Sequence, residues 1–435
     1  MRSSLTTDGD AEMQAPPTRS NSHIKILAWA LPSAAALGSN LPGVGPLFGF
    51  RILTLVVVVV AVAYPAETSK RGLSKPLSAL AVGWIVVGLL LSLIAVDGSA
   101  AFRTMTSISL GLLLALACVR IMRSEPRLMG WLAQGWFLSF VLTGSIAVWE
   151  LSTGEHLANY FLPAGVPGGQ LPAATFFNPN AFAIYLVCVQ AMILWSLGRT
   201  GRPLVRVLLF ASSAWCAFLI MTTGSRLSLA AFVLLTIGFL AIDRMSLTRA
   251  LLVSAVVGVI IWFTVPSVGA AISMYMPEDV RSTSLSQSML GLENSETTEG
   301  RRLELYKSSI WLVGASWGLG VGPGNFGAAL SQYDVPYETG GTLSPHSFVG
   351  ELAAEFGIPV LVGFGLFTWS LVRRVMPHRG RERSALLATG MAFILAGLAN
   401  SGYLLASTMW MFFATMLCMV VLAELQPANR PEDGQ

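Results

Sequence analysis

Apolar runs recur along this chain at a length that fits a membrane, and they constrain the fold more than any other feature. A helix needs about 17 to 25 residues to cross a bilayer, and twelve runs approach or reach that length. They lie at residues 24–38, 46–64, 77–96, 104–122, 128–150, 180–198, 203–222, 226–242, 248–266, 347–375, 384–400 and 403–424. Only 11% of the residues are charged. The pattern predicts an all-α integral membrane protein with about 12 transmembrane helices.

Lysine and arginine are distributed unevenly between the two sides that these helices would define. With a cytoplasmic N-terminus, 20 of the 27 basic residues fall in cytoplasmic loops and tails. Basic residues collect on the cytoplasmic side of membrane proteins, so we expect both termini there, in a multi-pass protein of the cytoplasmic membrane. The expected division is a disordered cytoplasmic tail (1–23), helices one to nine (24–266), an extracytoplasmic loop (267–346), helices ten to twelve (347–424) and a cytoplasmic tail (425–435).

Two long connections fall on the outer side in this topology. The first, near residues 150–179, is rich in glycine and proline, and the second covers about 267–346. Loops of this length are usually functional or disordered. The second loop contains apolar residues at helical spacing, which predicts an amphipathic helix on the outer membrane interface. These residues are Leu303, Tyr306, Ile310, Val313 and Trp317.

Several other functional classes find no support in the sequence. The four cysteines lie inside apolar runs and form no CxxC pair or Cys/His cluster, so neither a disulfide framework nor a metal site is predicted. The glycine-rich run 318–324 follows a helical pattern and lacks a Lys-Ser/Thr pair, which argues against a nucleotide site. The basic residues follow the topology, so no nucleic-acid surface is predicted.

Three arginines on the outer side depart from the charge bias. Arg226 stands at the outer start of the eighth run, and Arg301 and Arg302 stand at the entry to the interfacial helix. A guanidinium group matches phosphate oxygens in a bidentate way, so each fits an anion clamp. Taken alone, Arg226 also fits an arginine that snorkels from a helix end, and the other two also fit solvated loop charges.

His346 lies in the segment that closes the second outer loop. Ser344 and Pro345 are residues typical of a helix start, which predicts a helix with His346 in its first turn. The helix would run to the Gly357-Ile358-Pro359 break. A helix N-terminus disfavours an imidazolium ion, so this histidine is expected to be neutral and able to accept a proton. An ordinary polar residue in a capping turn fits the sequence as well.

Two glutamates follow this histidine inside an apolar run. Ser347, Glu351 and Glu355 share one stripe at four-residue spacing. A carboxylate in a membrane span is costly unless it has a partner, so each is expected either to orient His346 or to neutralise an arginine. By contrast, His156 lies in an outer loop with no evident partner nearby in the sequence.

Four blocks in this order resemble the O-antigen ligase / O-antigen polymerase family of bacterial membrane glycosyltransferases. They are Thr175–Ala183, Thr223–Arg226, Arg302–Tyr306 leading into Gly320–Phe326, and Pro345–Pro359. The resemblance covers about residues 175–360, and the twelve-helix topology fits the whole chain.

The resemblance implies a GT-C-like fold that acts on the outer face of the membrane. The donor would be a glycan on undecaprenyl pyrophosphate, and the acceptor would be a hydroxyl of a glycan or of an envelope lipid. Neither a metal nor a nucleotide cofactor is implied. Arg226 and Arg302, with Arg301, would bind the donor pyrophosphate, and His346 would act as general base on the acceptor hydroxyl. The supporting residues would be Glu351, Glu355, Asn178, Asn180 and Ser225.

Three activities are compatible with these residues. A ligase joins a finished glycan to a different acceptor, whereas a polymerase extends a like chain from the same donor. A transporter for lipid-linked glycan would use the arginines for binding only, and it would place ionisable residues near the middle of several helices. Charges within the apolar runs are few and lie near the outer rim, which favours an enzyme, and the family resemblance favours a ligase.

Overall fold

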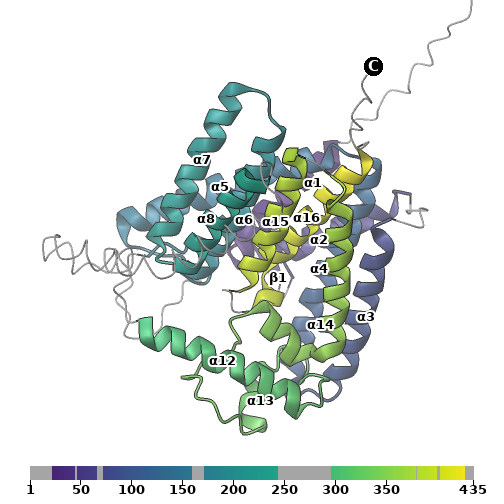
Figure 1. The fold of residues 1–435 in the computed structure, drawn as a ribbon, viewed down its shortest axis with the longest axis vertical. Coiled ribbons are helices and arrows are strands. Elements are labelled where there is room, and N and C mark those ends of the chain that lie inside the picture. Colours follow the sequence, from purple (N-terminus) through teal and green to yellow (C-terminus); the bar gives the residue numbers. More distant parts are fainter. Residues whose placement is uncertain are drawn as a thin grey trace, which may run out of the picture.

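The protein is a bundle of helices capped at one end by two further helices (Figure 1). The computed structural model describes residues 22–44, 47–65, 72–158, 171–242, 295–378, 380–398 and 402–426. The ninth predicted span, 248–266, lies outside these residues, as does the first part of the second outer loop.

Each of the other eleven apolar runs is a helix, as the hydrophobic pattern predicts. The α-helices are α1 (Ser22–Leu37), α2 (Gly49–Val62), α3 (Ser74–Ser92), α4 (Gly98–Ser124), α5 (Leu128–Thr153), α6 (Pro179–Arg199), α7 (Pro203–Thr222), α8 (Arg226–Ile242), α12 (Ser295–Ala315), α13 (Phe326–Gln332), α14 (Phe348–Val375), α15 (Gly380–Gly397) and α16 (Ser407–Leu425). The 3-10 turns are η1 (Gly38–Asn40) and η2 (Tyr403–Leu405). A two-residue antiparallel pair, β1 (Gly43–Val44) with β2 (Leu47–Phe48), is the small exception to an all-α chain.

The membrane character of the bundle is visible in its surface and its centre. Among the described residues, α3, α4, α5, α6, α7, α14 and α16 are long and apolar enough to cross a membrane. At the centre, α16 is buried along almost its whole length and packs on α4. At the periphery, α7 exposes Leu204, Val207, Leu208 and Phe210. An apolar outer surface of this kind suits lipid rather than water.

The two ends of the bundle differ in their polar residues. At one end, which we call the arginine end, Arg123 and Arg374 both pair with Glu424, and Arg120 donates from Nε to the carbonyl of Tyr64 at 2.7 Å. The opposite end, where α12 and α13 lie, we call the α12 end (Figure 1). In the described part of the chain, α1 to α8 alternate in direction, so the connections α1–α2, α3–α4, α5–α6 and α7–α8 lie toward the α12 end, which the predicted topology places outside.

A helix, α12, forms where the sequence predicts the interfacial helix, and its two faces are distinct. Leu305 and Leu312 on α12 are buried, with Ser308 and Ser309 beside them, and α12 packs on α14. The apolar stripe identified in the sequence lies on the other face, where Leu303 and Ile310 are exposed and Trp317 follows in the exposed turn. The rest of the protein therefore packs on the face of Leu305 and Leu312. It leaves Leu303 and Ile310, which belong to the predicted apolar stripe, exposed.

Candidate functional site

The glycine-rich turn after α12 fits against a break in α14. Gly357 has φ 71° and ψ −171°, so α14 is two helical segments joined at this residue. Ile358 N donates to Gly318 O at 2.8 Å, and Gly322 N donates to Glu355 O at 3.0 Å. A Cβ on Gly320 would lie 2.6 Å from Glu355 O, so only glycine permits this approach. The break predicted at Gly357 is confirmed, and the turn rests directly on it.

Two buried glutamates of α14 bind backbone amides of other segments. Glu355, 3% exposed, accepts from Gly324 N at 2.7 Å and from Phe326 N at 3.5 Å. Glu351, 5% exposed, accepts from Tyr403 N in η2 at 3.0 Å. Sequence reasoning expected each carboxylate to orient a histidine or neutralise an arginine. The hydrogen bonds show instead that they fix the loops around the first segment of α14.

Asn325 joins the same turn to the connection between α3 and α4. Its Oδ1 accepts from Asp97 N at 2.6 Å, and its Nδ2 donates to Asp97 O at 3.1 Å and to Pro323 O at 2.8 Å. The residue is fully buried. Hydrogen bonds from Ala100 N and from Ser99 Oγ lower the pKa of Asp97, with the first the larger cause. The turn is thereby tied to two helices that are distant in sequence.

His346 lies just before α14 rather than in its first turn, so the predicted helix start is wrong. The N-cap is Ser347, whose Oγ accepts from Gly350 N at 3.3 Å, and Ser344 does not cap the helix. His346 has φ 49°, a left-handed conformation that histidine adopts more readily than most residues. The side chain is half-buried. The error arose because two serines flank the Pro-His pair, and either could cap a helix.

Arg226 occupies the predicted position at the start of a helix, whereas Arg301 and Arg302 lie inside α12, which begins at Ser295, and not at its entry. Arg226 is the first residue of α8 and is half-buried. Ser225 precedes it, is buried, and donates from Oγ to Ser228 Oγ at 2.9 Å. Arg302 is a half-buried residue of α12. Arg301 is in the same helix, and its side chain is outside the described structure.

The first outer loop ends in a capped helix. Asn178 is the N-cap of α6, and its Oδ1 accepts from Ala181 N at 2.9 Å, while Pro179 takes the first helical position. Asn180 is exposed in the first turn. Asn178 therefore has a structural task, which an Asn-Pro pair before an apolar run predicts.

Comparisons with known proteins point to the same region. The family model described as "O-Antigen ligase" matches residues 211–365. The chain is also similar to the Bacillus subtilis (strain 168) teichuronic acid biosynthesis protein TuaE, with 23% identity over 347 residues, which cover 78% of this chain and 70% of the relative. Over residues 211–365 the chain thus resembles the O-antigen ligase family. The apolar helices of the described residues indicate a multi-pass membrane protein.

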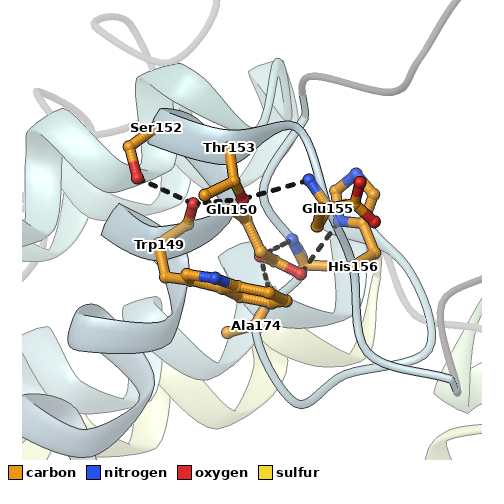
Figure 2. A network of polar contacts seen from close by, with 8 residues as sticks. Trp149, Glu150, Ser152, Thr153, Glu155, His156 and Ala174 are labelled. Atoms are coloured by element: carbon orange, nitrogen blue, oxygen red, sulfur yellow. Dashed lines mark hydrogen bonds and ion pairs between the residues drawn. The ribbon is translucent and has the colours of Figure 1, made fainter.

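The protein contains a further polar cluster that sequence reasoning missed. Glu150, in the last turn of α5, is 1% exposed, and its Oε1 lies 2.9 Å from His156 Nδ1 (Figure 2). Its Oε2 accepts from Ala173 N at 2.9 Å and from Ala174 N at 2.6 Å. The view that His156 lacks a partner nearby in the sequence is wrong. A lone carboxylate at the end of an apolar run, six residues before a histidine, was the available signal.

The range that resembles the family contains three of the candidate residues. Arg226, Arg302 and His346 all lie within residues 211–365 and in segments at the α12 end. At that end, hydrogen bonds connect the glycine-rich turn to α14 and to the α3–α4 connection, and connect α14 to η2. Asn178 and Asn180 belong to the neighbouring first outer loop.

Proposed function

We propose that this protein is a membrane glycosyltransferase of the O-antigen ligase type. It transfers a glycan from undecaprenyl pyrophosphate to an acceptor hydroxyl on the outer face of the cytoplasmic membrane. The observation that carries the proposal is the position of the family match, because residues 211–365 contain both candidate phosphate-binding arginines and the candidate base. The relative's part in teichuronic acid biosynthesis supports a cell-surface polysaccharide as the product class.

The two arginines bind the donor pyrophosphate. Arg226 begins α8, so its side chain is accompanied by the unsatisfied amides of a helix N-terminus, which attract anions. Arg302 contributes a second guanidinium from α12, with Arg301 beside it in the sequence. When the glycosidic bond to the pyrophosphate breaks, negative charge grows on the leaving oxygen. Fixed cations at that position stabilise the transition state.

His346 removes the proton from the acceptor hydroxyl. The oxygen attacks the anomeric carbon of the donor glycan, the bond to pyrophosphate breaks, and the configuration inverts in a single displacement. A base must reach the proton and have a pKa suited to the task. The cap at Ser347 and the bonds of Glu351 and Glu355 hold the segment that follows the histidine, which supports a fixed position for it.

The membrane placement follows the charge bias. The arginine end lies in the cytoplasm with both termini, and the α12 end lies outside in a GT-C-like arrangement. The exposed Leu303, Ile310 and Trp317 contact the outer lipid interface, as a helix with an apolar face does. The lipid-linked donor then reaches the arginines from within the bilayer.

A polymerase of the same family is the alternative function. It uses the same donor and extends a like chain, and the same three residues would take the same roles. Long lipid-linked polymer accumulates in cells that lack a ligase, and single repeat units accumulate in cells that lack a polymerase. This difference distinguishes the two activities.

The donor-binding role is tested by transfer assays on purified protein with lipid-linked glycan. Arg226→Lys keeps the charge and removes the planar fork, so we expect the KM for the donor to rise at least 10-fold. Arg206→Lys, on α7, is the matched control and should leave the KM unchanged. An unchanged donor KM in Arg226→Lys would refute the assignment.

The base role is tested in the same assay. His346→Ala should lower kcat at least 100-fold while the protein accumulates normally. His378→Ala removes a histidine from the arginine end, where its Nδ1 lies 3.7 Å from Glu382, and should retain full activity. Normal turnover by the His346→Ala protein would exclude His346 as the base.

A further inference from the structure

Glu150 is a buried carboxylate at an unfavourable place in its own helix. It lies in the last turn of α5, where the negative end of the helix dipole opposes an anion. The residue is 1% exposed. A buried charge is tolerated only when neighbouring groups form hydrogen bonds or ion pairs with it. The partners of Glu150 therefore indicate its structural role.

Those partners belong to the first outer loop and not to α5. One carboxylate oxygen accepts from two successive amides, Ala173 N at 2.9 Å and Ala174 N at 2.6 Å, and the other faces His156 Nδ1 at 2.9 Å (Figure 2). Ala174 has φ 51°, a left-handed conformation that is strained for any residue with a Cβ. The carboxylate thus holds a strained backbone in place.

The conformation of Ala174 determines the direction of residues 175–178, which follow it. Thr175 Oγ1 donates to Ala36 O, and Asn40 Nδ2 donates to Thr175 O at 3.0 Å. Phe176 then packs on Phe182 and Tyr185. The next side chain, Phe177, is 56% exposed. An exposed aromatic ring on a fixed backbone offers a large apolar face, and the apolar C–H face of a sugar ring complements such a surface.

We propose that Glu150, held by His156, is a positioning residue for glycan transfer, because it fixes residues 173–178 so that Phe177 packs against a sugar ring of the glycan. The inference rests on the proposed function and assigns part of its glycan contact. Glu150 acts through the loop and touches neither donor nor acceptor. Its loss therefore weakens glycan binding and leaves the chemical step at His346 in place.

Kinetics of the full-length protein test the role. Glu150→Gln keeps the shape and removes the charge that two amides share. We expect kcat/KM for the glycan to fall about 10-fold, the effect of losing one or two charge-assisted hydrogen bonds, through KM rather than kcat. Glu155→Gln is the matched control, because Glu155 is an exposed carboxylate of the same loop (Figure 2), and it should leave both constants unchanged.

Cysteine labelling gives a readout that is independent of activity. The four native cysteines are buried, so Phe177→Cys provides an accessible thiol for a membrane-impermeant maleimide. Glu150→Gln in this background should raise the labelling rate about 5-fold or more, and Glu155→Gln should not. If Glu150→Gln does not accumulate, His156→Phe removes one partner, retains the carboxylate, and should change labelling and KM in the same direction.

Rescue separates positioning from general stability. Glycine adopts the left-handed conformation without strain, so Ala174→Gly should restore at least half of the kcat/KM that Glu150→Gln loses. Unchanged labelling, or faster labelling with unchanged kinetics in a wild type that transfers glycan, overturns the inference and leaves the proposed function intact. A wild-type protein without transfer activity overturns the proposed function, and the inference with it.

Discussion

The two ends of the bundle use their carboxylates differently. At the arginine end, Glu424 pairs with Arg123 and Arg374, and Glu382 pairs with Arg199 at 3.3 Å. At the α12 end, the partly exposed Glu304 pairs with Lys307 on the same helix, but the buried carboxylates accept from backbone amides of loops and turns. These are Glu150 with Ala173 and Ala174, Glu351 with Tyr403, and Glu355 with Gly324 and Phe326.

This difference separates two kinds of task. An ion pair between two helices connects segments whose backbone is already fixed by helical hydrogen bonds. It therefore contributes to the packing of the helices against each other. A carboxylate bound to loop amides fixes backbone that no helix or sheet would otherwise hold. The α12 end thus contains loops in fixed, partly strained conformations, as expected where a site requires accurate placement. Four predictions test this contrast, and we give them from the largest expected effect to the smallest.

Gly357→Ala should have the largest effect on stability, because Gly357 forms the break in α14 against which the glycine-rich turn packs. The added Cβ would lie 2.3 Å from Gly318 O, and φ is 71°. We expect destabilisation of more than about 3 kcal/mol and loss of folded protein. Gly363→Ala is the control in the same helix, where a Cβ meets nothing within 4 Å. Normal accumulation of Gly357→Ala in membranes would contradict the account of the break.

Glu355→Gln and Glu424→Gln compare the two ends directly. The first replaces a carboxylate oxygen that Gly324 N approaches at 2.7 Å, so the turn loosens, and transfer by the folded protein should fall at least 10-fold. The second leaves two arginines without their partner and should cost about 2 kcal/mol of stability, with transfer per folded molecule unchanged. Thermal unfolding and turnover on the same samples measure both. If Glu355→Gln and Glu424→Gln lost transfer activity equally, the proposed difference between the α12 end and the arginine end would be wrong.

Asn325→Ala tests the link between the glycine-rich turn and the α3–α4 connection. Three hydrogen bonds are lost, and at about 1 kcal/mol for each we expect destabilisation of roughly 2 kcal/mol after relaxation. Urea unfolding of the purified protein provides the measurement. Asn40→Ala removes an exposed amide of the same end that donates to Leu37 O and Thr175 O. It should cost less than Asn325→Ala, and a reversed order would count against the link.

Arg199→Gln should have the smallest effect. Its pair with Glu382 is about one-third exposed on both sides, and exposed pairs contribute at most about 1 kcal/mol. We expect a small drop in the unfolding midpoint that disappears at high salt, with transfer unchanged. A large loss of transfer would show that the arginine end takes part in the reaction.

The sequence predicted the helices well because membrane spans are specified by composition and length. The eleven described runs, the break at Gly357 and the helix that contains Leu303 and Ile310 all follow from periodicity and from glycine and proline positions. Pairing between distant segments was not predictable in the same way. Glu351 and Glu355 were expected to meet a charged side chain, yet they bind amides of η2 and the glycine-rich turn, which only the folded chain brings near.

The helix start near His346 shows a second limit. Ser344 and Ser347 are equally suitable as caps in the sequence, and tertiary packing decides for Ser347. The same limit applies to Glu150, whose partners at Ala173 and Ala174 come from the far end of a long loop. Residue type and spacing identify candidates for chemistry, whereas the geometry that orders them depends on contacts over more than twenty residues.

The most direct test of the central claim is the glycan profile of cells that lack this protein, complemented with wild type or with His346→Ala at matched abundance. We predict that wild type restores transferred glycan and that His346→Ala leaves long lipid-linked polymer to accumulate on the outer face. Accumulation of single repeat units would assign the chain to the polymerases instead. Full-length transferred glycan in the His346→Ala cells, or glycan trapped on the cytoplasmic face, would contradict catalysis at the α12 end.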